Sequence, residues 1–293
     1  MNYTEETTCF TCEGEHLMGI VARPEQLASV GVVVIVGGPQ YRAGSHRQFV
    51  LLSRVLAASG IAVLRFDYRG MGDSTGDLRD FEAVDSDVGA AIDALQKSVP
   101  TVNRIALWGL CDGASAALLY CHQTNDPRVA GLCLLNPWVR SVESLARTQV
   151  KHYYAQRLMQ REFWGKLLRG GVALKALAGL MANLRVALLG AGASASSPSA
   201  TPQNGRKSEP FQTQMAIAWN KFPGRIALIL SGNDYTAKEF LEHLLQEKQW
   251  GEAMNHPRLA RHDLPDADHT FSSLLDRQAT EALTVAWLHD ERH

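Results

Sequence analysis

The sequence has little net charge, few cysteines and no basic start followed by an apolar run. Its 293 residues carry a net charge of −1, so the whole chain lacks the basic footprint of a nucleic-acid-binding protein. Five cysteines are an odd number spread through the chain, which favours reduced thiols over a disulfide framework. The opening MNYTEETT shows no secretory signal, and we therefore expect a cytoplasmic protein.

Metal-ligand clusters and glycine-rich phosphate loops do not stand out either, so we expect neither a metal nor a cofactor. The pair Cys9 and Cys12 has CxxC spacing, but no second pair follows at the spacing of a zinc site. Positions three apart in a strand face opposite sides of a sheet. We interpret both cysteines as ordinary residues of an N-terminal strand.

The hydrophobic content of 46% is sufficient for a large buried core, and its pattern alternates between strands and helices. Such alternation predicts an α/β fold with a mostly parallel sheet and helices on both faces. Strands are expected at 4–12, 15–22, 32–36, 61–66, 105–108, 129–135, 225–230 and 258–264. Helices are expected at 46–59, 81–97, a segment following Cys111, 236–248 and 271–288.

A region at 137–220 interrupts this alternation and reads as an inserted, mainly helical cap, with a flexible tract near 190–208. The core is then 1–136 and 221–293. Residues 140–207 hold eleven Lys or Arg against two Glu, a net charge of +9. We expect this basic cap to attract an anionic substrate or, as a minor alternative, an anionic membrane surface. A solvated helix surface is the simpler interpretation.

The segment GLCDG places Cys111 between an apolar run and a small-residue helical segment. In the corresponding GxSxG turn, the central residue is a nucleophile pushed outward between a strand and a helix. A cysteine at a helix N-terminus is stabilised as the reactive thiolate. Cys111 is therefore the predicted nucleophile. The alternative is a buried small residue on a binding scaffold.

An acid and a base are expected later in the chain, in that order. Asp234 follows the strand RIALILSG, and His269 lies in PDADHTFSS before the last helix. Asp234 can also cap the helix that follows it, and Asp266 and Asp268 are turn residues or rival partners for the histidine. The order Cys111, Asp234, His269 predicts a catalytic triad.

The oxyanion of such a site needs two backbone donors. The N–H of Asp112 is the first, and the second is expected from GGPQYRAGSHRQ. Pro39 has no N–H, which leaves Gly38 as the preferred donor and Gln40 as the alternative. His46 and Arg47 open the next helix and are candidates for the substrate rim or simply surface residues.

Four separated stretches together resemble the α/β-hydrolase superfamily over almost the whole chain. FDYRGMGDS is similar to its DxRGxGxS loop, and the cysteine nucleophile resembles that of dienelactone hydrolases. GGPQYRAGSHRQFVLL, GLCDGASAALLY and SGNDYTAKEF resemble the exosortase A system-associated hydrolase 1 group. This resemblance implies the same triad, Cys111, Asp234 and His269, and a link to exopolysaccharide loci.

A thiolate nucleophile favours activated acyl groups, so we predict hydrolysis of ester, thioester or lactone bonds through an acyl-enzyme. Acyl transfer to a glycan and non-catalytic ligand binding are the alternatives. A carboxylate nucleophile at Asp112 is disfavoured because Cys111 holds the central position of the motif. The expected assembly is a monomer or homodimer.

Overall fold

The structure is a computed structural model, and it describes residues 3–38, 40–140 and 209–290. Eight strands form one sheet in the order β1-β2-β4-β3-β5-β6-β7-β8. The strands are β1 (Tyr3–Cys12), β2 (Glu15–Pro24), β3 (Val30–Ile35), β4 (Ala62–Phe66), β5 (Arg104–Leu110), β6 (Val129–Leu135), β7 (Arg225–Ser231) and β8 (Leu259–Leu264). The helices are α1 (Gln48–Ala58), α2 (Asp85–Ser98), α3 (Asp112–Thr124), α7 (Phe211–Lys221), α8 (Tyr235–Gln246) and α9 (Leu274–His289).

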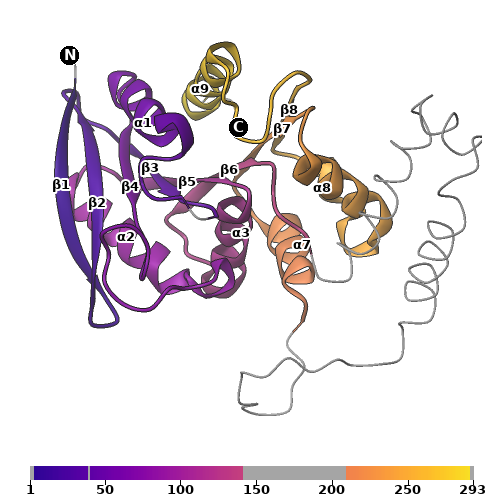
Figure 1. Cartoon of the computed structure of the whole chain (residues 1–293), viewed down its shortest axis with the longest axis horizontal. Coiled ribbons are helices and arrows are strands. Elements are labelled where there is room, and N and C mark those ends of the chain that lie inside the picture. The colour runs from indigo at the N-terminus through magenta and orange to yellow at the C-terminus, as the bar shows by residue number, and fades with distance from the viewer. Residues whose placement is uncertain (1–2, 39, 141–208, 291–293) are drawn as a thin grey trace, which may run out of the picture. The chain divides into compact units, whose positions relative to one another are not determined.

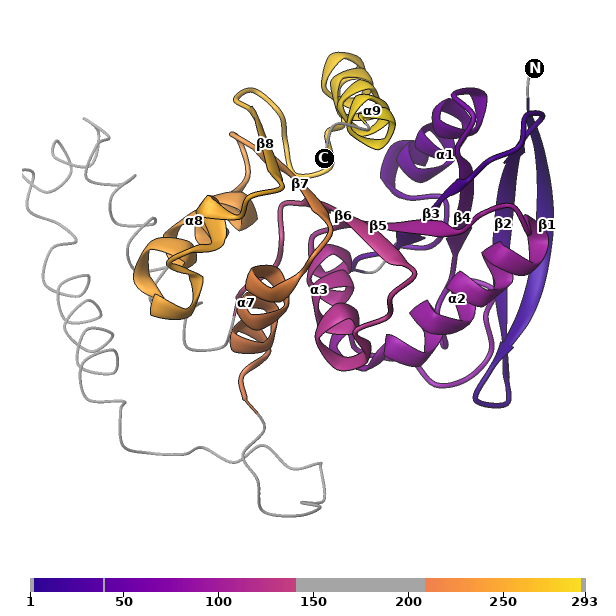
Figure 2. The same cartoon turned by 180° about the vertical axis from the view of Figure 1, so that it is seen from behind.

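The sheet is parallel from β4 through β8, and the helices cover both of its faces. Helices α1 and α9 lie on one face, while α2, α3 and α7 lie on the other (Figure 1, Figure 2). The central strands are buried along nearly their whole length. Continuous apolar runs are typical of strands covered on both faces. The predicted α/β architecture is therefore confirmed.

The first two strands form the predicted antiparallel hairpin, which turns at Glu13 and Gly14. Both turn residues have positive φ, 49° and 88°, as the tight turn of a two-residue hairpin requires. Cys9 is exposed and Cys12 is buried, and neither forms a disulfide. The two cysteine side chains thus lie on opposite faces of one strand.

Three predicted helices begin later than their hydrophobic period indicated, for a backbone reason. The helix expected from residue 46 begins at Gln48, because His46 and Arg47 have φ of 52° and 62°. The helix expected from residue 271 begins at Leu274, because Phe271 has φ of 51°. The helix expected from residue 81 begins at Asp85, after a short 3-10 turn.

The chain divides into a compact unit of residues 1–139 and 209–293 and a second unit of residues 140–208. We expected the core to resume at residue 221, but it includes α7, which packs against α3. The predicted basic cap and flexible tract fall almost entirely on residues 141–208, outside the described part of the chain. In the part that is described, no helix is long and apolar enough to cross a membrane.

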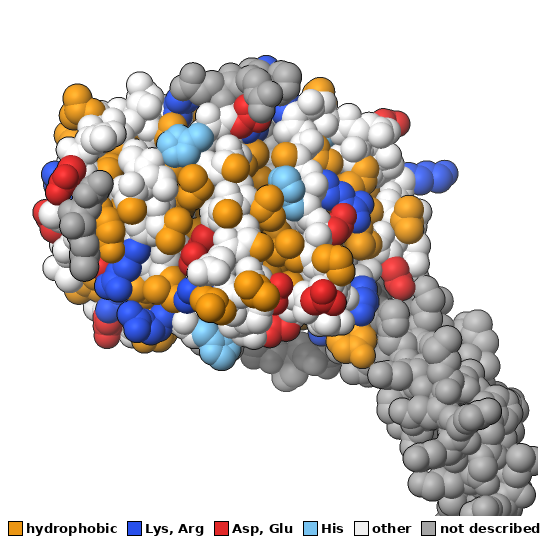
Figure 3. Space-filling view, turned by 90° about the horizontal axis from the view of Figure 1, so that it is seen from above, with side chains coloured by type: hydrophobic (Ala, Val, Ile, Leu, Met, Phe, Trp, Pro, Cys, Tyr) orange, Lys and Arg blue, Asp and Glu red, His pale blue; other side chains and the backbone are white. Residues whose placement is uncertain are grey.

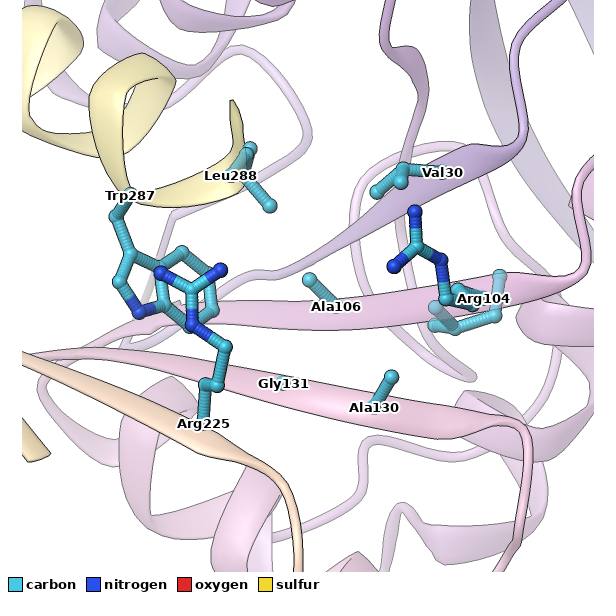
Figure 4. Close-up of a pocket in the computed structure, with 9 residues that line it drawn as sticks. Val30, Arg104, Ala106, Ala130, Gly131, Arg225, Trp287 and Leu288 are labelled. Carbon is cyan, nitrogen blue, oxygen red and sulfur yellow. The ribbon is translucent and has the colours of Figure 1, made fainter. Parts of the chain in front are cut away.

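The C-terminal helix α9 packs against the sheet at the amino-terminal ends of its parallel strands. Trp287 of α9 lies over Gly131 of β6, where a Cβ would come within 2.7 Å of the indole. The Arg225 guanidinium stacks over the same ring at 5.3 Å and donates to the carbonyl of Asp290 (Figure 4). These contacts anchor α9 at the amino-terminal ends of the strands, opposite the strand ends that carry the candidate site.

The face over α1 and α9 mixes hydrophobic side chains with charges of both signs (Figure 3).

Candidate active site

Cys111 stands between β5 and α3 in a strained backbone conformation, with φ of 61° and ψ of −126°. Its N–H donates to the carbonyl of Leu135 on β6 at 2.9 Å, and its own carbonyl accepts from Ala114 N at 3.0 Å. Non-glycine residues held at positive φ cost free energy and cluster at functional sites. The turn is a nucleophile elbow that sets Cys111 at the start of α3 with its side chain half-buried.

Glycines make this turn possible because strand and helix approach too closely for side chains. A Cβ on Gly113 would lie 2.5 Å from the carbonyl oxygen of Ile35, and one on Gly109 would overlap the backbone of Gly113. Neither clash involves the end of a flexible side chain that can move away. The two glycines that flank Cys111 in GLCDG are thus required by packing.

Asp234 and His269 lie together at the carboxyl ends of β7 and β8. His269 Nδ1 is 2.9 Å from Asp234 Oδ2, and the Asp234 side chain is 7% exposed against 35% for His269. Asp234 also caps α8 by accepting from Thr236 N and Ala237 N, each at 3.1 Å. Asp234 therefore makes both contacts considered for it, one with the histidine ring and one with the start of α8, and these bonds fix the orientation of its carboxylate.

His269 also lies close enough to Cys111 for the two side chains to interact, which joins the three residues. The pKa of His269 is raised to about 10, first by the hydrogen bond to Asp234, then by that to Cys111, with burial opposing both. A histidine with this pKa is an imidazolium at neutral pH. The imidazolium is then paired with a carboxylate on one side and a sulfur on the other, which is the arrangement that stabilises a thiolate.

The rival partners of His269 have other roles. Asp268 accepts from Thr270 N at 3.1 Å and Ser272 N at 2.9 Å, so it holds the turn before α9. Asp266 uses its carbonyl, which accepts from Asn233 Nδ2 at 3.2 Å. In the described part of the chain, the carboxylate on the histidine ring is that of Asp234.

Asn136 belongs to this site and was missed in the sequence. Its Nδ2 donates to Ser231 Oγ at 2.7 Å and to the carbonyl of His269 at 3.2 Å, while its Oδ1 accepts from Ser231 N at 2.9 Å. It is fully buried and has φ of 44°. Asn136 ties the ends of β6 and β7 to the histidine loop. Its place directly after the apolar strand 129–135 was the one available signal.

The loop after β3 carries the candidate oxyanion donors. Gly38 has φ of 61°, and its N–H donates to Asp112 Oδ1 at 2.6 Å. The structure thus brings Gly38 and Asp112 together, with the Asp112 carboxylate as the acceptor. Gln40 uses its side-chain oxygen to accept from Ser45 N at 3.1 Å.

The loop FDYRGMGDS holds this donor loop in place. Buried Asp67 accepts from Arg42 N at 2.6 Å and forms an ion pair with the Arg42 side chain. Ser74 Oγ donates to the carbonyl of Asp67 at 2.6 Å. The stretch therefore acts as scaffold beside the site. His46 and Arg47 lie on an exposed 3-10 turn before α1. Their role at a substrate rim stays a prediction.

Within the described ranges, no group of three His, Cys, Asp or Glu side chains is placed to hold a metal ion. The site built by the structure consists of a strained cysteine, a histidine, a buried carboxylate and the nearby Gly38 N–H. This arrangement suits nucleophilic attack by sulfur with an adjacent proton carrier.

Comparison with known proteins places the fold. A sequence model described as the alpha/beta hydrolase family matches residues 32–283, most of the chain. The chain belongs to the alpha/beta hydrolase family. The nucleophile elbow and the strand order just described are those of this α/β-hydrolase fold. A search of curated proteins found no match.

Solved structures of esterases and a dienelactone hydrolase share this fold at low identity. Esterase Pf2001 of Pyrococcus furiosus is 15% identical, with a TM-score of 0.62 over 98% of this chain and 92% of that one. Est1E of Butyrivibrio proteoclasticus, solved with ferulic acid, is 16% identical, with a TM-score of 0.61 over 96% and 99%. A dienelactone hydrolase of Anabaena variabilis is 14% identical, with a TM-score of 0.59 over 98% of each chain. The protein is a hydrolase of esterase-like fold.

Proposed function

We propose that the protein hydrolyses activated acyl bonds, such as esters, thioesters or lactones, through Cys111, His269 and Asp234. The observation that carries the proposal is the position of the His269 ring, which is hydrogen-bonded to Asp234 and interacts with the side chain of Cys111. The strained backbone of Cys111 at the end of β5 supports it. Esterase activity of structural neighbours is a property of those proteins and serves here as analogy.

The reaction follows from the charges of these groups. Cys111 Sγ, as thiolate, attacks the acyl carbon, and the carbonyl π electrons move to oxygen. Collapse of this tetrahedral intermediate breaks the bond to the leaving group, which takes the proton of the His269 imidazolium. His269, now neutral, removes a proton from water as the water attacks the thioester. Departure of the sulfur returns the thiolate, and Asp234 holds the ring orientation throughout.

The experiment that tests this proposal combines a substrate screen with thiol labelling. Short p-nitrophenyl esters, acyl thioesters and lactones are offered to the wild type and to Cys111→Ala. We expect hydrolysis of at least one class by the wild type and its loss in the variant. Alkylation by iodoacetamide, followed at each cysteine by mass spectrometry across pH, measures the thiol pKa.

His269→Ala should slow the alkylation of Cys111 near neutral pH, because the adjacent cation is removed. The matched control is His16→Ala, on the exposed face of β2. Exposed Cys9 is the reference thiol within the same chain. A Cys111 that reacts no faster than Cys9 and ignores the loss of His269 would refute the proposal.

Non-catalytic ligand binding is the second candidate, and the Asp112 carboxylate favours it. That carboxylate accepts the backbone hydrogen bond that a substrate oxygen would need. Binding without turnover and an unreactive Cys111 would support it. Acyl transfer to a glycan would use the same residues and is distinguished by product analysis with acceptor present. The link to exopolysaccharide loci stays a prediction.

A further inference from the structure

The side chain of Asp112 turns back toward the backbone N–H groups of the candidate site. Oδ1 accepts from Gly38 N at 2.6 Å, across 74 residues of sequence. The backbone N–H groups of Gly113 and of Asp112 itself also act on this carboxylate and lower its pKa. It packs so closely on the loop after β3 that a Cβ on Gly37 would overlap Oδ1. We call these three donors, the N–H groups of Gly38, Asp112 and Gly113, the backbone cradle.

The backbone cradle has the composition of an oxyanion hole. One donor comes from the loop after β3 and two come from the first turn of α3, whose dipole adds positive potential. The oxyanion formed when Cys111 attacks a substrate carbonyl carbon would need the N–H groups of Gly38 and Asp112. In the structure, the anion on these donors is the chain's own carboxylate.

The surroundings of Asp112 add negative charge. Burial raises the pKa of Asp112, backbone hydrogen bonds oppose this shift, and the nearby Asp80 raises the pKa further. Tyr68, at the end of β4, is buried and has its pKa raised by burial and then by Asp112, Asp80, Asp87 and Asp67. A second anion brought to the backbone cradle would therefore meet repulsion.

We propose that the Asp112 carboxylate is an internal occupant of the backbone cradle that a substrate carbonyl must displace, and that Asp112 thereby selects against acyl groups carrying negative charge. The selectivity among acyl groups rests on the proposed function, whereas the contact between Asp112 and Gly38 does not. Two anions cannot share the same three donors, so an anionic acyl group meets the displaced carboxylate as well as Asp80. A neutral acyl group meets no such charge, and Asp112 is a specificity-determining residue.

The first test compares alkylation of Cys111 by iodoacetate and iodoacetamide, which differ by one negative charge. In both reactions a bond forms between Sγ and the methylene carbon, and iodide leaves. Asp112→Asn should raise the rate ratio of iodoacetate to iodoacetamide roughly tenfold at Cys111, because a negative charge on the neighbouring residue is removed. The ratio at exposed Cys9 should stay constant. The matched control, Asp77→Asn, removes one charge from an exposed position and should leave both ratios unchanged.

The second test observes the backbone cradle directly and needs no reactive thiol, and its first measurement uses the wild type alone. In the wild type labelled with 15N-glycine, the Gly38 amide should shift as the Asp112 carboxyl group titrates, at a pH above the ordinary pKa of an aspartate. In folded Asp112→Asn this transition should vanish. A Gly38 amide that does not titrate in the wild type would overturn the inference, as would an unchanged rate ratio in Asp112→Asn.

The two proposals fail in different ways. A titrating Gly38 amide together with an unreactive Cys111 and no hydrolysis would leave Asp112 in the backbone cradle and refute the hydrolase. Hydrolysis that depends on Cys111, with no effect of Asp112→Asn on charge discrimination or on Gly38, would keep the hydrolase and refute the role of Asp112.

Discussion

The nucleophile elbow and the histidine loop bring their catalytic side chains together by different physical means. The elbow around Cys111 depends on steric exclusion, because Gly109 and Gly113 lie where no Cβ fits. The histidine loop at 264–273 depends on hydrogen bonds that Asp234 and Asp268 accept and that Asn136 donates. A position where no Cβ fits tolerates almost no substitution. A position held by hydrogen bonds loses folding free energy according to how many of those bonds a substitution removes.

Breaking the elbow should have the largest effect. Gly113→Ala places a methyl group 2.5 Å from the carbonyl oxygen of Ile35, so strand and helix must separate. We expect a loss of about 3 kcal/mol or more in the free energy of unfolding, measured by urea denaturation. Gly89→Ala, on α2 with its nearest neighbour atom at 3.6 Å, is the control and should be neutral or stabilising. Equal effects of the two variants would contradict the steric account.

Removing the amide that ties the histidine loop to the sheet should have the next largest effect. Asn136→Ala deletes three hydrogen bonds and leaves Ser231 N and the carbonyl of His269 buried without that partner. We expect a loss of about 1–3 kcal/mol in the free energy of unfolding and, if the proposed hydrolase is active, a lower kcat. Asn220→Ala, whose Nδ2 makes one exposed hydrogen bond, is the control and should change stability little. Wild-type stability of Asn136→Ala would show that the tie is not needed.

Loss of the turn-holding carboxylate should be milder. Asp268→Ala removes the acceptor of Thr270 N and Ser272 N at an exposed position. We expect a loss of about 1 kcal/mol, comparable with the loss of a helix cap. The His269–Asp234 pair should survive, so the pKa of His269, measured by NMR titration, should stay raised. A His269 pKa that falls to its ordinary value would instead make Asp268 part of the charge network.

The last prediction concerns pH rather than a single contact. The pKa of His269 is about 10 in the folded protein against 6.5 as its ordinary value. A raised histidine pKa stabilises the fold fully below the unfolded value, and this contribution is lost as pH rises through the folded value. The difference in unfolding midpoint between the wild type and His269→Ala should therefore be greatest below pH 6.5 and shrink toward pH 10. A difference that grows with pH would mean that the imidazolium is not the stabilised form.

The order and position of Cys111, Asp234 and His269 could be predicted because each follows a strand of the parallel sheet. The carboxyl ends of parallel strands meet at one edge of a sheet, so their residues converge without any knowledge of side-chain angles. The predicted helix starts erred at His46, Arg47 and Phe271, where hydrophobic period continues but the backbone takes positive φ. These late helix starts depend on tertiary contacts, which the spacing of hydrophobic residues does not indicate.

The sequence by itself determined the α/β alternation, the elbow glycines and the residues at the strand ends, because local period and backbone sterics depend on near neighbours. Only the tertiary structure decided which carboxylate meets His269, that Asn136 joins two strands to its loop, and that Asp112 bonds to Gly38. Those contacts span 35, 133 and 74 residues. Hydrogen bonds are directional, and over such separations their partners depend on how the folded chain orients each group rather than on spacing.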